Sequence, residues 1–134
     1  MISVALIADS GRALEAMTLS LASVPGTHIV RHYHGGSSIG RALARCAPDL
    51  VLIDEMCWPK LALRRIAEAR LAVPEAPIVV RVGHPESGWR AEALRAGASA
   101  VVPATAGAAT LAVVLGEVVP RISPSQMEPS AIAA

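Results

Sequence analysis

The chain has 134 residues, 53% hydrophobic and 2% aromatic, which is typical of one domain with an aliphatic core. Its formal net charge of +1 and its few aromatic rings argue against a nucleic-acid-binding surface in these residues. The two cysteines, Cys46 and Cys57, lack the spacing of a metal or redox motif, and no uncharged segment reaches membrane-spanning length. We therefore expect a cytoplasmic protein that does not contact a membrane.

Short apolar runs alternate with helical patterns along the chain. Strands are predicted over residues 2–8, 27–33, 50–54, 78–82 and 100–102. Helices are predicted over residues 11–23, 38–46, 60–73, 86–96 and 106–119, the fourth of them ending at Gly97. This alternation predicts an α/β fold, a flavodoxin-like (βα)5 doubly wound parallel sheet with strand order 2-1-3-4-5. Residues 1–119 form this domain, and the Pro/Ser/Ala-rich residues 120–134 are interpreted as a linker or disordered tail.

Acidic residues follow two strands that are neighbours in this order. Asp9 follows the first strand, and Asp54 and Glu55 follow the third. Because function in such folds gathers at the carboxyl ends of the strands, we expect these side chains to share an acidic pocket. Facing carboxylates suit a hard cation such as Mg²⁺. On spacing alone, a helix cap at Asp9 and a plain strand end at Asp54 explain the same residues equally well.

Two phrases of sequence carry a family resemblance. Residues 48–54 (Pro-Asp-Leu-Val-Leu-Ile-Asp) and 93–98 (Ala-Leu-Arg-Ala-Gly-Ala), together with Asp9 and the order of elements, resemble the receiver domain of two-component response regulators. They are closest to the subclass with a LuxR-type helix-turn-helix output domain. The resemblance covers roughly residues 2–119. It implies a domain that regulates transcription through an output domain absent from these residues, which alone would contact DNA.

The same resemblance implies roles for individual residues. Asp54 takes the phosphoacceptor position, where its carboxylate would attack the phosphohistidine of a histidine kinase. The metal ligands would be Asp9, Asp54 and the backbone carbonyl of Met56, with Mg²⁺ as the cofactor. Phosphoryl transfer in such a site depends on positioning and on neutralised charge.

The sequence departs from the family pattern at three positions. Ala8 replaces one of the paired acids, Val82 replaces the Ser or Thr after the fourth strand, and Ala104 replaces the lysine after the fifth. Lys60, the only lysine, belongs to the third helix. Each lost charge-assisted hydrogen bond removes roughly 1.5–3 kcal/mol of phosphoryl binding. We therefore expect a pseudo-receiver: a pocket without an ammonium group, weak Mg²⁺ binding and inefficient phosphorylation.

The resemblance also implies an interaction surface on the fourth helix, the fifth strand and the fifth helix. We expect this surface to form a homodimer or to bind a partner protein. Its predicted contact residues are Trp89, Arg90, Arg95 and Val101. A rare aromatic residue such as Trp89 either fills the core or anchors an interface.

A second hypothesis is a small-molecule-binding regulatory domain that uses the crevice at the strand ends. Its lining would be Asp9, Trp58, Val82 and His84. An enzyme is not expected, because no nucleophile and base are paired in any known motif.

Two further groups of polar residues receive plainer interpretations. His32 and His34 are interpreted as solvent-facing residues at the end of an edge strand. The arginines at 64, 65 and 70 are interpreted as a solvated helix face.

Overall fold

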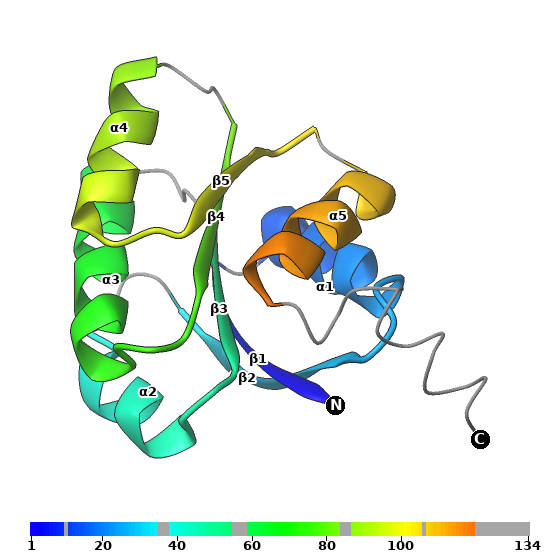
Figure 1. The fold of residues 1–134 in the computed structure, drawn as a ribbon, viewed down its shortest axis with the longest axis horizontal. Coiled ribbons are helices and arrows are strands. Elements are labelled where there is room, and N and C mark those ends of the chain that lie inside the picture. Colours follow the sequence, from blue (N-terminus) through cyan, green and yellow to red (C-terminus); the bar gives the residue numbers. More distant parts are fainter. Residues whose placement is uncertain (10, 35–37, 55–58, 84–86, 106, 120–134) are drawn as a thin grey trace.

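A computed structural model describes residues 1–9, 11–34, 38–54, 59–83, 87–105 and 107–119, which form three layers (Figure 1). The strands are β1 (Ile2–Ile7), β2 (Thr27–Tyr33), β3 (Leu50–Asp54), β4 (Ile78–Val82) and β5 (Ala100–Pro103). The helices are α1 (Arg12–Ala22), α2 (Gly40–Cys46), α3 (Pro59–Ala72), α4 (Ser87–Ala96) and α5 (Ala108–Val118). The predicted residues 120–134 of the tail lie outside the described ranges.

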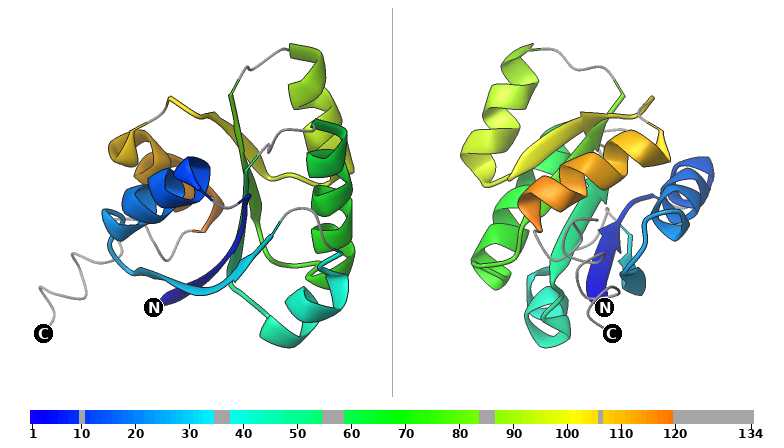
Figure 2. Two further views of the ribbon diagram at one scale, coloured as in Figure 1. Left: turned by 180° about the vertical axis from the view of Figure 1, so that it is seen from behind. Right: turned by 45° about the vertical axis from the view of Figure 1, so that its right-hand side comes forward.

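The strands form one parallel sheet in the order β2-β1-β3-β4-β5, which confirms the predicted flavodoxin-like topology. Helices α1 and α5 cover one face of the sheet, and α2, α3 and α4 cover the other (Figure 2). The predicted element boundaries agree with the structure to within about two residues. No described helix has the length and apolar character needed to cross a membrane.

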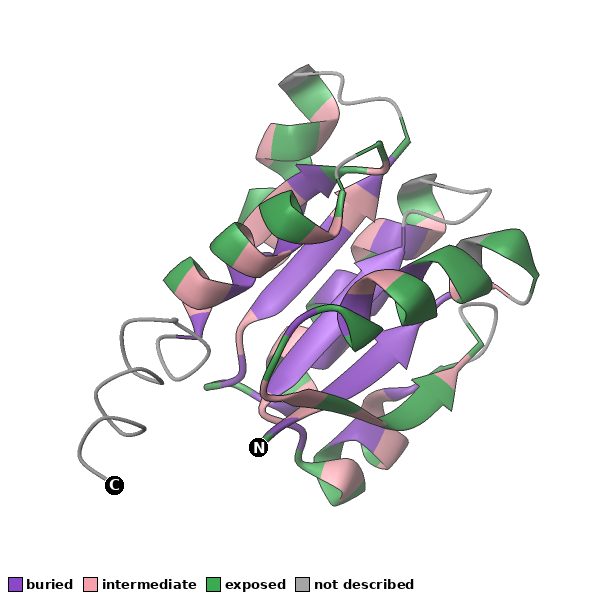
Figure 3. Ribbon diagram, turned by 90° about the vertical axis from the view of Figure 1, so that its right-hand side faces the viewer, coloured by how far each residue is buried: buried purple, intermediate pink, exposed green. Residues whose placement is uncertain are grey.

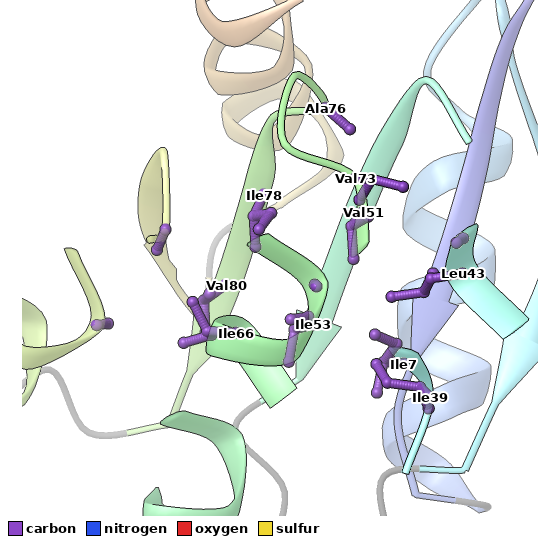
Figure 4. Packing of buried hydrophobic residues seen from close by; sticks show 14 of the residues in the cluster. Ile7, Ile39, Leu43, Val51, Ile53, Ile66, Val73, Ala76, Ile78 and Val80 are labelled. Carbon is purple, nitrogen blue, oxygen red and sulfur yellow. The ribbon is translucent and has the colours of Figure 1, made fainter. Parts of the chain in front are cut away.

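The core consists of two apolar clusters, one on each face of the sheet, because alternate strand residues point to opposite sides. The cluster beneath α1 and α5 includes Leu6, Met17, Leu52, Val79 and Leu115. The cluster beneath the other three helices includes Ile7, Leu43, Ile53, Ile66 and Val80 (Figure 4). Figure 3 shows the central strands buried between helices whose outer surfaces are exposed.

Asp49, in the phrase before β3, has a structural role. Its carboxylate accepts hydrogen bonds from the backbone N–H and the hydroxyl of Ser3, at 2.9 and 3.0 Å. The Asp49 N–H lies 3.0 Å from both the carbonyl and the hydroxyl oxygen of Ser3. These bonds join the start of β3 to the start of β1, so Asp49 sets the register of the two strands. That register places Asp54 at the carboxyl ends of the strands.

Glu68 of α3 binds the start of α2. Its carboxylate accepts hydrogen bonds from the Ser38 hydroxyl at 2.8 Å and from the Ile39 N–H at 3.1 Å, and it pairs with the buried Arg65. Burial would raise the pKa of the Glu68 carboxyl, but these donors and the Arg65 charge together lower it below its ordinary value. The interpretation of Arg65 as a solvated residue is wrong, because it neutralises this carboxylate beneath the helix surface.

Arg70 of α3 joins several chain segments, so its interpretation as a solvated residue is also wrong. Its guanidinium donates to the Gly97 carbonyl at 2.7 and 3.1 Å, and to the Pro74 and Ala76 carbonyls at 2.8 and 2.9 Å. Gly97 ends α4 as predicted, with a φ of +126° that favours glycine. A Cβ at Gly97 would lie 2.9 Å from the Arg70 side chain, so both conformation and space require glycine there.

We expect Gly97→Ala to lower the free energy of unfolding by about 1–3 kcal/mol, because alanine is strained at this φ and displaces Arg70. Gly88→Ala is the matched control, since Gly88 lies within α4 with no atom within 4 Å of the added Cβ. That variant should be neutral or more stable by about 0.5–1 kcal/mol. Urea denaturation measures both, and equal stabilities of the two variants would contradict the assigned role of Gly97.

Candidate functional site at the carboxyl edge of the sheet

Asp54 ends β3 in the middle of the sheet and pairs with a cation from the next strand. The β3–β4 ladder places Asp54 opposite Arg81. Arg81 Nε lies 3.5 Å from Asp54 Oδ1, and the two side chains are 16% and 11% exposed, respectively. A carboxylate so shielded from water needs a nearby positive charge, and the guanidinium supplies it.

The expectation of a pocket without an ammonium group stays a prediction, but it left out the guanidinium of Arg81. Lys60 is exposed at the start of α3, as predicted, but Arg81 brings a guanidinium to Asp54. Sequence reasoning missed this residue because β4 was treated as one apolar strand. The available indication was an arginine among Ile78, Val79, Val80 and Val82, in a strand expected to be buried on both faces.

Asp9 leaves β1 at the same edge of the sheet. The β1–β3 ladder ends at the pair of Ile7 and Ile53, so Asp54 lies one residue beyond that pair and Asp9 two. Asp9 is 33% exposed at its side chain, and its Oδ1 lies 3.8 Å from His34 Nε2. Asp54 and Asp9 therefore each have a nitrogen-bearing side chain beside them, Arg81 from β4 and His34 just after β2.

The two histidines of the β2 end were expected to be plain surface residues. His34 is 57% exposed but lies next to Asp9, and His32 Nε2 is 2.9 Å from the Ala8 carbonyl oxygen. Both therefore contact the end of β1, which the spacing alone did not indicate. Among the described residues, no group of three His, Cys, Asp or Glu side chains could hold a metal ion.

The three positions that depart from the family pattern have apolar side chains with little or no exposure, and two of their backbone N–H groups are already hydrogen-bonded. Ala8 and Val82 are fully buried, and Ala104 is partly buried. The Ala8 N–H donates to the Tyr33 carbonyl at 3.1 Å, and the Ala104 N–H donates to the Val82 carbonyl at 2.6 Å. These apolar side chains offer no hydrogen bond to a bound anion, and among the described residues beside Asp54 the positive charge is that of Arg81.

The described donors fit Mg²⁺ poorly. Mg²⁺ takes oxygen ligands in a strict octahedral geometry. Asp54 Oδ1 already lies 3.5 Å from a guanidinium, and Asp9 Oδ1 lies beside an imidazole. Glu55, the third predicted residue of the acidic pocket, and the Met56 carbonyl, the third predicted metal ligand, lie outside the described residues.

The space beside Arg81 is small. The described residues around it, including Met17, Leu52 and Leu111, enclose a cavity of about 20 Å³, which is room for about one water molecule. This cavity has no room for an organic ligand. Trp58 and His84, which the small-molecule hypothesis places in the lining, lie outside the described residues.

The predicted interaction residues divide into two pairs. Trp89 and Val101 are partly buried and pack against the core beneath α3 and α4. The Trp89 Nε1 is shielded from solvent and has no hydrogen-bond partner among the described residues. Arg90 and Arg95 are exposed on α4. The first pair thus contributes to the core, and the second is available to a partner.

Comparison with models of protein families finds no match, and neither does comparison with curated proteins. Solved structures do match. A LuxR-family two-component response regulator from Aurantimonas sp. SI85-9A1 has a TM-score of 0.78 at 20% identity, covering 96% of this chain and 94% of the other. A response regulator from Burkholderia pseudomallei with a phosphorylated aspartic acid, calcium ion and citrate has a TM-score of 0.66 at 16% identity, with coverage of 98% and 75%.

The same architecture also occurs in a protein with a different description. A putative pilus assembly protein from Burkholderia thailandensis has a TM-score of 0.73 at 17% identity, covering 88% of this chain and 98% of the other. Likeness at these identities establishes the fold. The chain therefore has the fold of response-regulator receiver domains, with Asp54 at the end of the central strand.

Proposed function

We propose that this chain is an atypical receiver domain of two-component signal transduction, with Asp54 in the phosphoacceptor position and held by Arg81. The observation that carries the proposal is the shielded ion pair between Asp54 Oδ1 and Arg81 Nε at the carboxyl end of the central strands. In this role the domain is a cytoplasmic signalling module and not an enzyme. It regulates transcription through an output domain that is not part of these residues.

Phosphorylation of Asp54 is inefficient in this proposal. The attacking carboxylate must approach a dianionic phosphoryl group, and the charge on that group must be neutralised in the transition state. Arg81 can neutralise part of it, because a guanidinium binds phosphoryl oxygens well. Val82 and Ala104 contribute nothing, and with Ala8 in place of an acid, Mg²⁺ binds weakly. A histidine kinase is therefore a poor partner for this site.

The ion pair also replaces the role of a phosphate in setting the conformation. In an ordinary receiver, a new negative charge at the acceptor shifts the population between two conformers. Here Asp54 already has a cationic partner in the adjacent strand, which favours one arrangement of the β3 and β4 ends. The domain then signals through protein contacts that do not wait for phosphorylation.

Those contacts are proposed to lie on α4, β5 and α5, as a homodimer or with a partner protein. Arg90 and Arg95 are exposed on α4, and Leu94 between them is 42% exposed. On α5, Val113 is 63% exposed. Exposed apolar side chains, with charged residues beside Leu94, are typical of a modest protein interface.

The ion pair is tested by a double-mutant cycle of Asp54→Asn and Arg81→Met. We expect Arg81→Met alone to lower the free energy of unfolding by roughly 2–4 kcal/mol, because it leaves a shielded carboxylate without its cation. In the Asp54→Asn background the same change should cost less, giving a coupling energy of about 1–3 kcal/mol by urea denaturation. Additive effects, within about 0.5 kcal/mol, would contradict an energetic pairing.

Phosphorylation is tested with acetyl phosphate and Mg²⁺, followed by intact mass. The unmodified chain should gain a phosphoryl group slowly and incompletely, and Asp54→Asn should gain none. The triple variant Ala8→Asp, Val82→Thr and Ala104→Lys restores the absent groups. It should be labelled at least about tenfold faster, since each restored contact is worth about 1.5–3 kcal/mol. Rapid, stoichiometric labelling of the unmodified chain at Asp54 would refute the proposal.

Self-association is tested by sedimentation velocity over a range of concentrations. We expect dimers at high concentration, weakened in an Arg90→Glu/Arg95→Glu variant because reversed charges disturb the interface rim. Arg64→Glu, an exposed arginine on α3, is the control and should dimerise normally. A chain that stays monomeric throughout would argue against the homodimer.

A further inference from the structure

One stretch of this nearly neutral chain has arginines and histidines but no carboxylates. Residues 16–48 contain no Asp or Glu, but they contain three arginines and three histidines: Arg31, Arg41, Arg45, His28, His32 and His34. The described part of this segment forms most of α1, the whole of β2 and α2. The β2 and α2 elements at this edge therefore carry three exposed arginines and no carboxylate of their own, although the formal net charge of the chain is only +1.

A groove runs along this edge between β2 and α2. It has a volume of about 510 Å³, and its lining includes Arg31 and Tyr33 from β2 and Arg45 and Cys46 from α2. A volume of this size accommodates a few residues of a peptide. The space beside Arg81, at about 20 Å³, does not.

The two arginines of the groove are available for a ligand. Both are exposed, and neither forms an ion pair with a carboxylate in the described part of the chain. Arg45 lies in the last turn of α2, where a positive charge interacts favourably with the helix dipole, so its presence has a structural explanation. Arg31 lies in a strand and has no such explanation.

The edge of β2 favours an extended ligand. β2 is the last strand of the sheet, and its side chains are largely exposed (Figure 3). The β1–β2 register skips Val30, since Val4 pairs with Ile29 and Ala5 with Arg31. Such a bulge discourages the edge strand from pairing with strands of other chains. The residues beyond the bulge, Arg31 to Tyr33, still border the groove. Extended peptides commonly bind along edges of this kind.

We propose that the groove between β2 and α2 binds an extended acidic segment of a partner protein, whose carboxylates pair with Arg31 and Arg45. This site is separate from the α4, β5 and α5 surface and from Asp54. Guanidinium groups bind carboxylates through paired hydrogen bonds, and a groove wall that lacks acids does not repel them.

A protein segment fits this groove better than a nucleic acid does. Phosphate-backbone binding draws on several cations, and single strands also need aromatic rings for stacking. Among the described residues, the groove lining offers the Tyr33 phenol ring and the His32 imidazole, and the Tyr33 hydroxyl donates to the Ala42 carbonyl at 3.3 Å. Burial and the neighbouring Cys46 thiol raise the pKa of Tyr33, so its hydroxyl remains a neutral donor.

Fluorescence anisotropy tests the proposal with a labelled peptide of alternating Glu and Thr. A matched peptide has Gln in place of Glu. We expect the acidic peptide to bind and its affinity to fall with added salt, and the Gln peptide not to bind. Arg31→Glu/Arg45→Glu should weaken binding at least about tenfold. Arg12→Glu, an exposed arginine of α1 outside the groove, should leave it unchanged.

A second readout places the peptide in the groove. In a Cys57→Ser background, the acidic peptide should slow alkylation of Cys46, and it should not do so in the Arg31→Glu/Arg45→Glu variant. Thermal melts of each variant check that the chain stays folded. No binding of the acidic peptide at low salt, equal binding of the Gln peptide, or an unprotected Cys46 would overturn the proposal. Tighter, Arg31- and Arg45-dependent binding of a single-stranded oligonucleotide would overturn the assignment to a protein.

Discussion

A carboxylate at the end of a central parallel strand is expensive to shield from water unless a positive charge accompanies it. In this chain the companion of Asp54 is Arg81, one strand away and in register. This pairing explains the surrounding positions. Because Arg81 balances the charge of Asp54, Ala8, Val82 and Ala104 can be small and apolar without leaving that carboxylate unpaired. Among the described residues at this edge, the Asp54–Arg81 ion pair is therefore the feature that balances the buried charge.

The fold could be predicted from the sequence because its determinants are local. Apolar runs of strand length, helical periodicity and the glycine after α4 each depend on residues close together in the chain. The position of Asp54 at the carboxyl edge then followed from the topology alone. Right-handed crossovers favoured the strand order, and the parallel sheet in the order β2-β1-β3-β4-β5 agrees with it.

The partners of the charged residues could not be predicted in the same way. Which residue of β4 lies opposite Asp54 depends on register between strands, and neither strand alone specifies it. Arg81 was therefore treated as part of an apolar run, although it neutralises the acid beside it. Arg65 and Arg70 show the same limit on a helix: periodicity indicates which side they share, but not that neighbouring helices and loops cover them.

Arg70 has a mechanical consequence for the α2, α3 and α4 layer. Its guanidinium binds the Gly97 carbonyl just after α4 and the carbonyls of Pro74 and Ala76 in the turn after α3. These two helices therefore cannot slide past each other without breaking several charge-assisted hydrogen bonds. Glu68 extends the connection from α3 to the start of α2. A change in the position of α4 therefore strains hydrogen bonds that also hold the turn after α3 and, through Glu68, the start of α2.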